Sequence, residues 1–375
     1  MKRKKISVLL AGVALMVGAA RGGHELPVYP SFYPHEIEIR TIPAAQAPKA
    51  LREAKIQAYI GGELNFTDAP AEQIRAIESL GSFVVVRVNP NSVLVGSNSS
   101  GCAIAKAAAQ ELTGQTGFVL HPYPVTPLQG DYLYHFDLAT TAKERFSEIQ
   151  ALPNSSRIKA TGNIARDHTA WSQARPDWDA EVIEVDATRQ LETAMFSVNG
   201  LIGPPWLRAG WFNAARLLAP AIADADLRQH VEAAARRLKA GDFADVAQRI
   251  NLERELVSAL AGDCRHMVVG YTVKREYVNV EFSAGIENIG YDAISGLHSP
   301  IFVRTVKLKD FPWNGWLSLG IANASAAAWN PVGGMSDRFG RMLGFALEDS
   351  ALLPSPYEAG WMLNRISDLP SDARR

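Results

Sequence analysis

The sequence has only two cysteines in 375 residues, and no spacing of Cys, His, Asp or Glu in it is typical of a metal site. It also lacks a nucleotide-binding glycine loop, an internal repeat and a low-complexity tract. Lys and Arg number 38 against 39 Asp and Glu, so the formal net charge of −1 provides no positive field for nucleic acid. These absences exclude a disulfide-rich scaffold and a nucleic-acid-binding protein, and they predict no metal and no cofactor.

Long apolar runs are also scarce, and the longest lies at the start of the chain. Residues 6–20 carry no charge and follow the basic residues 2–5, with the small residues Gly18 and Ala20 at positions suited to cleavage. Because a membrane span needs about 20 apolar residues, this segment predicts a cleaved signal peptide, residues 1–20, and a periplasmic or secreted mature protein. Its removal takes the formal net charge from −1 to −5. No later segment is apolar enough to span a membrane.

An exported protein folds where its cysteines can be oxidised. We therefore expect Cys102 and Cys264 to form a disulfide, which would join the first third of the chain to the approach of a central sheet. If they do not pair, each is a small buried side chain, and Cys102 is a conceivable nucleophile.

Strands and helices alternate after residue 36, which predicts an α/β fold with a partly parallel sheet covered on both faces. The expected elements are strand 36–42, helix 44–54, strand 56–61, helix 70–80 and strand 82–89. The βαβ-like unit that opens this series, with ALREAKIQAYIGG as its second half, resembles the opening lobe of a periplasmic solute-binding protein. The resemblance is one of pattern over about 70 residues. It implies a small-molecule ligand and a membrane transporter as partner, but no particular binding residues.

The mature chain is longer than one hydrophobic core usually supports, so two lobes are expected. The predicted divisions are an α/β lobe over 21–150, a linker or lid over 151–180, and an α+β lobe over 181–375 with a helical block at 208–260. Each lobe is expected to contain a mixed sheet flanked by helices.

The stretch 267–316 is the richest in strand-forming and aromatic residues and is expected to lie at the centre of the fold. Its alternating pattern slips at residues 274–276, which predicts a bulge or turn that is either solvated or the rim of a ligand site. A further strand is expected over 301–308.

A turn rich in Gly and Ser precedes an expected helix over 103–112, after the apolar residues 93–95. Free N–H groups at a helix start, together with serine hydroxyls, suit a carboxylate or phosphate, whereas a capped and solvated turn is the plainer interpretation. The predicted ligand-binding residues here are Ser97, Asn98, Ser99, Ser100 and Gly101.

The same segment supports an alternative, a secreted hydrolase with Ser99 or Cys102 as its catalytic nucleophile. Residues 97–101 have part of the Ser-containing elbow pattern between an expected strand and helix. Such a reaction needs an acid and a base, for which Asp263 with His266, or Asp292 with His298, are candidates.

Aromatic residues gather in two further places. A proline-rich segment leads into Tyr132, Tyr134 and His135, which we expect to line a ligand cleft. The tail from Trp313 to Trp361 either wraps the core or lines a pocket suited to a sugar-like ligand.

The sequence thus favours an exported protein that binds a small anionic or polar molecule. A hydrolase is the alternative, and a periplasmic assembly factor is the second alternative.

Overall fold

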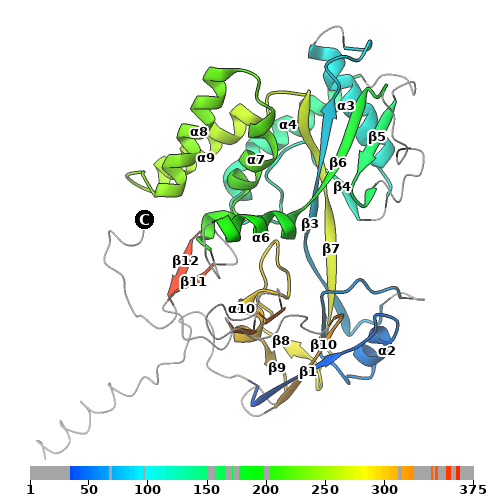
Figure 1. Ribbon diagram of the computed structural model, residues 1–375. Coiled ribbons are helices and arrows are strands. Elements are labelled where there is room, and N and C mark those ends of the chain that lie inside the picture. The colour runs from blue at the N-terminus through cyan, green and yellow to red at the C-terminus, as the bar shows by residue number, and fades with distance from the viewer. Residues whose placement is uncertain are drawn as a thin grey trace, which may run out of the picture.

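Figure 1 shows the computed structural model, in which an upper and a lower lobe are joined by the long strands β3 (Ile74–Val88) and β7 (His266–Asn279). The expected α/β class, with a mixed sheet flanked by helices in a two-lobed chain, is confirmed. The structure describes residues 34–66, 70–95, 98–115, 117–150, 157–164, 171, 177–197, 203–310, 315–323, 339–340, 343–344, 352–355 and 360–363. The expected signal peptide and the possible sugar-binding residues Trp313, Trp329 and Tyr357 lie outside these ranges.

The described elements fall into the two lobes by their place along β3 and β7. The lower lobe contains β1 (Glu36–Thr41), α2 (Ala47–Arg52), β2 (Ala58–Ile60), β8 (Ile286–Glu287), α10 (Pro300–Thr305), β9 (Lys307–Leu308) and β10 (Trp316–Ile321). The upper lobe contains α3 (Asn98–Leu112), β4 (Phe118–Leu120), η1 (Tyr132–His135), α4 (Phe136–Glu148), β5 (Ile158–Thr161), β6 (Ala180–Asp186), α6 (Ala187–Ser197), η2 (Pro205–Arg208), α7 (Gly210–Leu218), η3 (Ala219–Ala221), α8 (Ala225–Ala240) and α9 (Val246–Leu260). Strands β11 (Leu352–Pro354) and β12 (Trp361–Leu363) form a separate antiparallel pair.

One sheet runs through both lobes, in the order β1-β10-β2-β7-β3-β6-β5, with β4 also pairing with β7. The pairs β1–β10, β10–β2 and β5–β6 are parallel, and the other pairs are antiparallel. In the described part of the chain, the polypeptide passes from the lower to the upper lobe within β3 and returns to the lower lobe within β7. The chain therefore passes between the lobes near residues 81 and 272. The linker was expected at residues 151–180, but β6, which begins at the end of that range, pairs with β3 in the upper lobe.

A bulge marks the passage between the lobes. The β3–β7 register shifts between Leu80 and Ser82, opposite Thr272 and Val273. A side chain on the intervening Gly81 would begin only 2.8 Å from the Thr272 hydroxyl oxygen, so the close approach of the two strands requires glycine. Because the extra residue reverses the alternation, Leu80 joins the same face of the sheet as Phe83 and Val85.

The sheet of the upper lobe is buried on both faces. Val84, Val86 and Val88 pack against α3 on one face. Phe83 and Val85 pack against α6, α7 and α9 on the other. A strand that is covered on both sides reads as a continuous apolar run, which explains the unbroken valines of β3.

The structure differs from the sequence-based expectations in β3, in α10 and in the register of β7. Residues 70–80 were expected to be helical, but Ile74 and Ile77 belong to β3 and are buried on opposite faces of the sheet. Residues 301–308 were expected to be a strand, but Pro300 begins the helix α10, where proline suits the first turn, and only Lys307–Leu308 form the short strand β9. The slip expected at 274–276 is absent from β7, whose register shifts lie opposite Gly81 and near Gly270.

An arginine–aspartate pair holds the start of β6. The Asp179 carboxylate, which is buried, accepts hydrogen bonds from the Arg157 guanidinium at 3.0 Å and from the Arg157 N–H at 2.8 Å, and also from the Ser92 hydroxyl. The Arg157 side-chain hydrogen bonds are the largest cause that lowers the pKa of Asp179 to about 2. Asp179 therefore stabilises the fold above its unfolded pKa near 4, and this stabilisation is lost as the pH falls through 2.

We expect Asp179→Asn to lower the free energy of unfolding by about 2 kcal/mol at pH 7. The difference from the wild type should shrink as the pH is lowered from about 4 to 2, because the wild-type carboxylate then takes up a proton. Urea unfolding of both proteins at several pH values measures this. A difference that stays constant with pH would show that the carboxylate charge is not the cause.

Candidate functional site

A groove of about 630 Å³ lies on the α6–α7 face of the upper sheet. Its floor is apolar, from Val85, Ile183 and Val185, and its walls come from α6, α7 and the turn after β5. The β5–β6 pair is parallel, and the groove lies at the carboxyl ends of these two strands. Open α/β sheets bind their ligands in this position. The volume suits a small molecule.

Two arginines and two unpaired polar atoms line the groove. Arg189 on α6 and Arg216 on α7 are exposed, and neither guanidinium has an ion pair or hydrogen bond with a described side chain. Gln190 Oε1 and His266 Nδ1 are buried without a hydrogen-bond partner among the described residues. Burial lowers the pKa of His266, so its imidazole is neutral at pH 7. The groove thus offers cationic groups at its mouth and a neutral acceptor inside.

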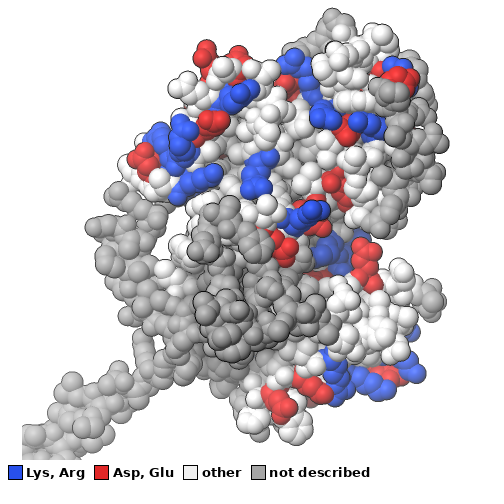
Figure 2. Space-filling model, viewed as in Figure 1, with Lys and Arg blue, Asp and Glu red and all other residues white. Residues whose placement is uncertain are grey.

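A polar cluster lies at the passage between the lobes, next to the groove. Glu184, in the groove, accepts a hydrogen bond of 2.8 Å from the Ser82 hydroxyl, which in turn contacts the Thr272 hydroxyl at 2.6 Å. On the lower side, the Lys274 ammonium donates to Ser295 O at 3.3 Å. Figure 2 shows charges of both signs gathered where the two lobes meet.

Glu276 is the buried centre of this region. Its carboxylate accepts hydrogen bonds from the backbone N–H groups of Gly61, at 2.9 Å, and Leu297, at 2.7 Å. His298 Nδ1 lies 3.5 Å from Glu276 Oε1, an ion-pair distance. A side chain on Gly296, where φ is +61°, would begin 2.3 Å from Glu276 Oε2, so the loop fits around the carboxylate only as glycine. Across the lobes, Arg208 of η2 lies 3.6 Å from the carboxylate of Asp292.

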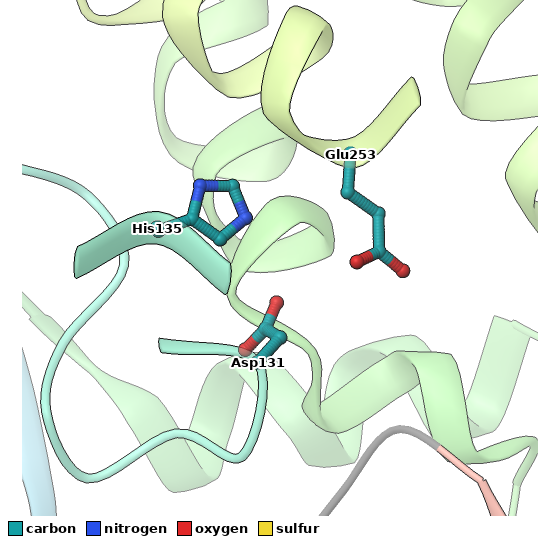
Figure 3. Close-up of side chains that lie close together, drawn as sticks. All are labelled: Asp131, His135 and Glu253. Atoms are coloured by element: carbon teal, nitrogen blue, oxygen red, sulfur yellow. The ribbon is translucent and has the colours of Figure 1, made fainter. Parts of the chain in front are cut away.

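A third polar group is fully enclosed in the upper lobe. Asp131, His135 and Glu253 place one ligand-type atom each within 4.8 Å of the others, and Figure 3 shows the three side chains facing a common space. All three are buried. Burial lowers the pKa of His135 to about 4 and raises the pKa of Glu253 to about 7. Burial also raises the pKa of Asp131, despite hydrogen bonds from Gly210 and Trp211.

The expected ligand residues do not form one site. Asn98 to Gly101 lie in the first turn of α3, and Ser97 lies outside the described residues. Because α3 packs on one face of the sheet and Tyr132 packs with the core on the other, the two expected groups lie on opposite faces. Whether the first turn of α3 binds an anion stays a prediction. His135 is enclosed in the buried group, whereas Tyr134 is partly exposed and faces the Arg249 guanidinium, 5.9 Å from its ring centre.

The strand expected before the nucleophile elbow is absent from the described residues. Residues 89–95 form turns rather than a strand, and Ser99 already belongs to α3. The predicted disulfide between Cys102 and Cys264 is confirmed, so this cysteine has no free thiol. The proposed acid–base pairs are not formed either, since His266 Nε2 contacts Leu217 O and His298 contacts Glu276.

No protein-family model matches the chain, and no curated protein matches it in sequence. Among solved structures it is similar to HbpA2 from Haemophilus parasuis, at 10% identity and a TM-score of 0.40, covering 70% of this chain and 56% of that one. It is also similar to the periplasmic binding protein DppA from Helicobacter pylori in complex with peptide STSA, at 13% identity and a TM-score of 0.39, covering 72% and 56%. A third is a nickel ABC transporter from Bacillus halodurans, at 11% and 0.41, covering 67% and 58%.

The chain spans less than two thirds of the length of each of these three proteins. Similarities of this size assign neither a family nor a ligand to it. Within the described ranges, no helix combines the length and the apolar composition that a membrane crossing requires.

Apart from His266, which was a candidate base, the residues of the groove were missed in the sequence. Arg189 and Arg216 each lie on an amphipathic helix, where an arginine is ordinarily a solvated side chain. The two are 27 positions apart, and only the packing of α6 and α7 on the same face of the sheet brings them to one groove.

Proposed function

We propose that the protein is an exported solute-binding protein that holds a small anionic molecule in the groove between α6 and α7. The observation that carries this is the pair of guanidinium groups, Arg189 and Arg216, which line one groove without carboxylate partners among the described residues. An anionic group is the ligand chemistry that arginine recognises best, through paired N–H donors.

Other atoms that line the groove could orient a ligand that carries polar groups besides its anionic group. Gln190 Oε1 has no donor among the residues that the structure describes, so a ligand N–H or O–H facing it would satisfy a buried acceptor. The apolar floor would accommodate a short hydrocarbon part. Asp186 lies in the same groove but already accepts the backbone N–H of Arg189 at 2.7 Å and caps α6.

The two-lobed form supports the same proposal. A ligand at the lower end of the upper lobe lies next to the polar cluster between the lobes, through the contact of Glu184 with Ser82. Closure of the lobes on that ligand would then present one defined surface to a membrane transporter, which we propose as the partner, in the periplasm.

We expect the double variant Arg189→Gln/Arg216→Gln to bind an anionic solute at least about tenfold more weakly than the wild type, because each lost charge-assisted hydrogen bond contributes about 1.5–3 kcal/mol. Thermal shift measures this with succinate, citrate, inorganic phosphate and Ala-Ala-Ala, each beside a neutral ester or amide where one exists. Native mass spectrometry of the protein isolated from the periplasm detects any solute that is bound already.

A matched control is Arg145→Gln/Arg236→Gln, which removes two exposed arginines on α4 and α8 away from the groove. This pair should bind as the wild type does. If the groove variant and the control bind the anions equally, or if neither the probes nor any isolated small molecule binds the wild type, the proposal is wrong.

A further inference from the structure

We propose that Asp131, His135 and Glu253 form a buried site for one divalent transition-metal ion, with Zn²⁺ as the best match, which fixes the packing of η1, α7 and α9. The site is separate from the groove, and the inference does not depend on solute binding. It stands on three side chains that face one enclosed space (Figure 3), two of which have a buried polar atom with no hydrogen-bond partner among the described residues.

The two atoms without a partner in the described part of the chain are His135 Nε2 and Glu253 Oε2. His135 is 0% exposed and Glu253 is 1% exposed, so water from the surface does not satisfy them. A buried polar atom without a partner costs about 1–3 kcal/mol, and two such atoms aimed at one space indicate that something is bound between them.

The second nitrogen of His135 is already fixed. Its Nδ1 lies 2.9 Å from the Tyr123 hydroxyl oxygen, in a buried contact. When Nδ1 carries the proton and donates it to that oxygen, Nε2 presents a bare lone pair to Asp131 and Glu253. Metal-binding histidines are held in this way, with the other ring nitrogen donating to an oxygen.

Each carboxylate is also oriented by hydrogen bonds from the protein and keeps lone pairs for an ion. Both oxygens of Asp131 accept the N–H of Gly210, at 2.9 and 2.7 Å, which caps the start of α7. Glu253 Oε1 accepts a hydrogen bond of 3.1 Å from the Arg249 guanidinium, which leaves Oε2 free for the ion. The caps thus orient the ligands without using all their lone pairs.

The elements that carry the ligands are tied together next to the site. Arg254, the neighbour of Glu253 on α9, donates two hydrogen bonds of 2.7 Å to the carboxylate of Asp137 at the start of α4. It also contacts Tyr134 O, next to His135. This clamp holds α9 against η1, so the ligands are already close together before any ion arrives.

The donor set selects the ion. One imidazole and two carboxylates suit Zn²⁺ and its first-row neighbours, whereas Ca²⁺ and Mg²⁺ prefer six or more oxygen atoms. Zinc bonds of about 2.1 Å keep any two ligands within about 4.2 Å of each other. The three ligand atoms now lie within 4.8 Å of one another, so the two most distant atoms must approach by at least about 0.6 Å to bind one ion. Rotation of the long Glu253 side chain can provide this movement.

The test is the metal content of the folded, full mature chain. After dialysis against EDTA and then against ZnCl₂, the wild type should hold one equivalent of zinc by mass spectrometry of the metal, and its Tm should rise by at least about 3 °C. Glu253→Gln and His135→Gln, both close in shape to the originals, should each bind zinc at least about tenfold more weakly. Circular dichroism confirms that they are folded.

The control variant is His230→Gln, which removes the exposed pair of His230 with Glu255, 3.2 Å apart, and should retain the zinc. If the ligand variants do not fold, Co²⁺ added to the wild type gives the second measurement, because nitrogen and oxygen ligands in a closed site produce a visible absorption that surface-bound Co²⁺ lacks. Wild-type protein that takes up no zinc, or equal zinc in the ligand variants and the wild type, or zinc lost only in His230→Gln, would overturn the proposal.

Discussion

Replacement of Cys102 and Cys264 by alanine should lower the free energy of unfolding by about 5 kcal/mol. The two residues are 162 positions apart, and their disulfide closes nearly the whole upper lobe into one loop. Loss of the link gives the unfolded chain many more conformations, and chain-entropy estimates grow with the length of the loop. The disulfide also pins the first turn of α3 to the segment before β7, and Cys264 packs against the core on that face.

Urea unfolding of the double variant and of the wild type with and without a reductant measures this effect. The reduced wild type should unfold at the same urea concentration as the variant, because both lack the same constraint. A difference below about 1 kcal/mol between the oxidised and reduced wild type would show that the unfolded chain is compact enough to make the link nearly irrelevant.

Glu276→Ala should lower the free energy of unfolding by about 3–5 kcal/mol, because it removes two buried hydrogen bonds to a charged acceptor, each worth about 1.5–3 kcal/mol. The change leaves the N–H groups of Gly61 and Leu297 without their acceptor and removes the carboxylate that lies 3.5 Å from His298 Nδ1. Burial alone would raise the pKa of Glu276, but the nearby His298 and Lys274 lower it, so the carboxylate is charged at pH 7.

Two further variants distinguish the loss of the Glu276 carboxylate from the effect of any substitution in β7. Glu276→Gln keeps the shape and one acceptor, and we expect it to lose roughly half as much stability. Arg275→Ala changes the next residue of β7, whose exposed ion pair with Glu78 at 2.9 Å should contribute less than about 1 kcal/mol. Equal losses in Glu276→Ala and Arg275→Ala, measured by urea unfolding, would contradict a special role for the buried carboxylate.

The sequence predicted those features that depend on local pattern. The valines at 84–86 indicated a buried strand because both faces of that strand are covered. The helix predicted for residues 70–80 is wrong because the spacing of Ile74 and Ile77 fits one face of a helix as well as the two faces of a strand. Only the pairing with β7 decides between the two structures. In the same way, tertiary packing overrides the strand-forming residues of α10.

The candidate sites were harder to predict because each joins distant segments. His135 was expected to bind a ligand, and it lies four residues from Asp131, but the third member of the buried group, Glu253, lies on another helix 118 positions later. The cysteines were predictable because compartment and count alone restrict them to one possible pair.

The two strands that pass between the lobes, β3 and β7, limit how the lobes can move. Both described passages between them are neighbouring strands of one ribbon, only one ladder position apart. Two adjacent links act as a single hinge line, so the lobes can rock and twist about it, whereas three separated links would resist rotation. The same closeness makes residues 82–272 an insertion whose two ends are already paired, so that a two-residue reverse turn could in principle replace the whole upper lobe.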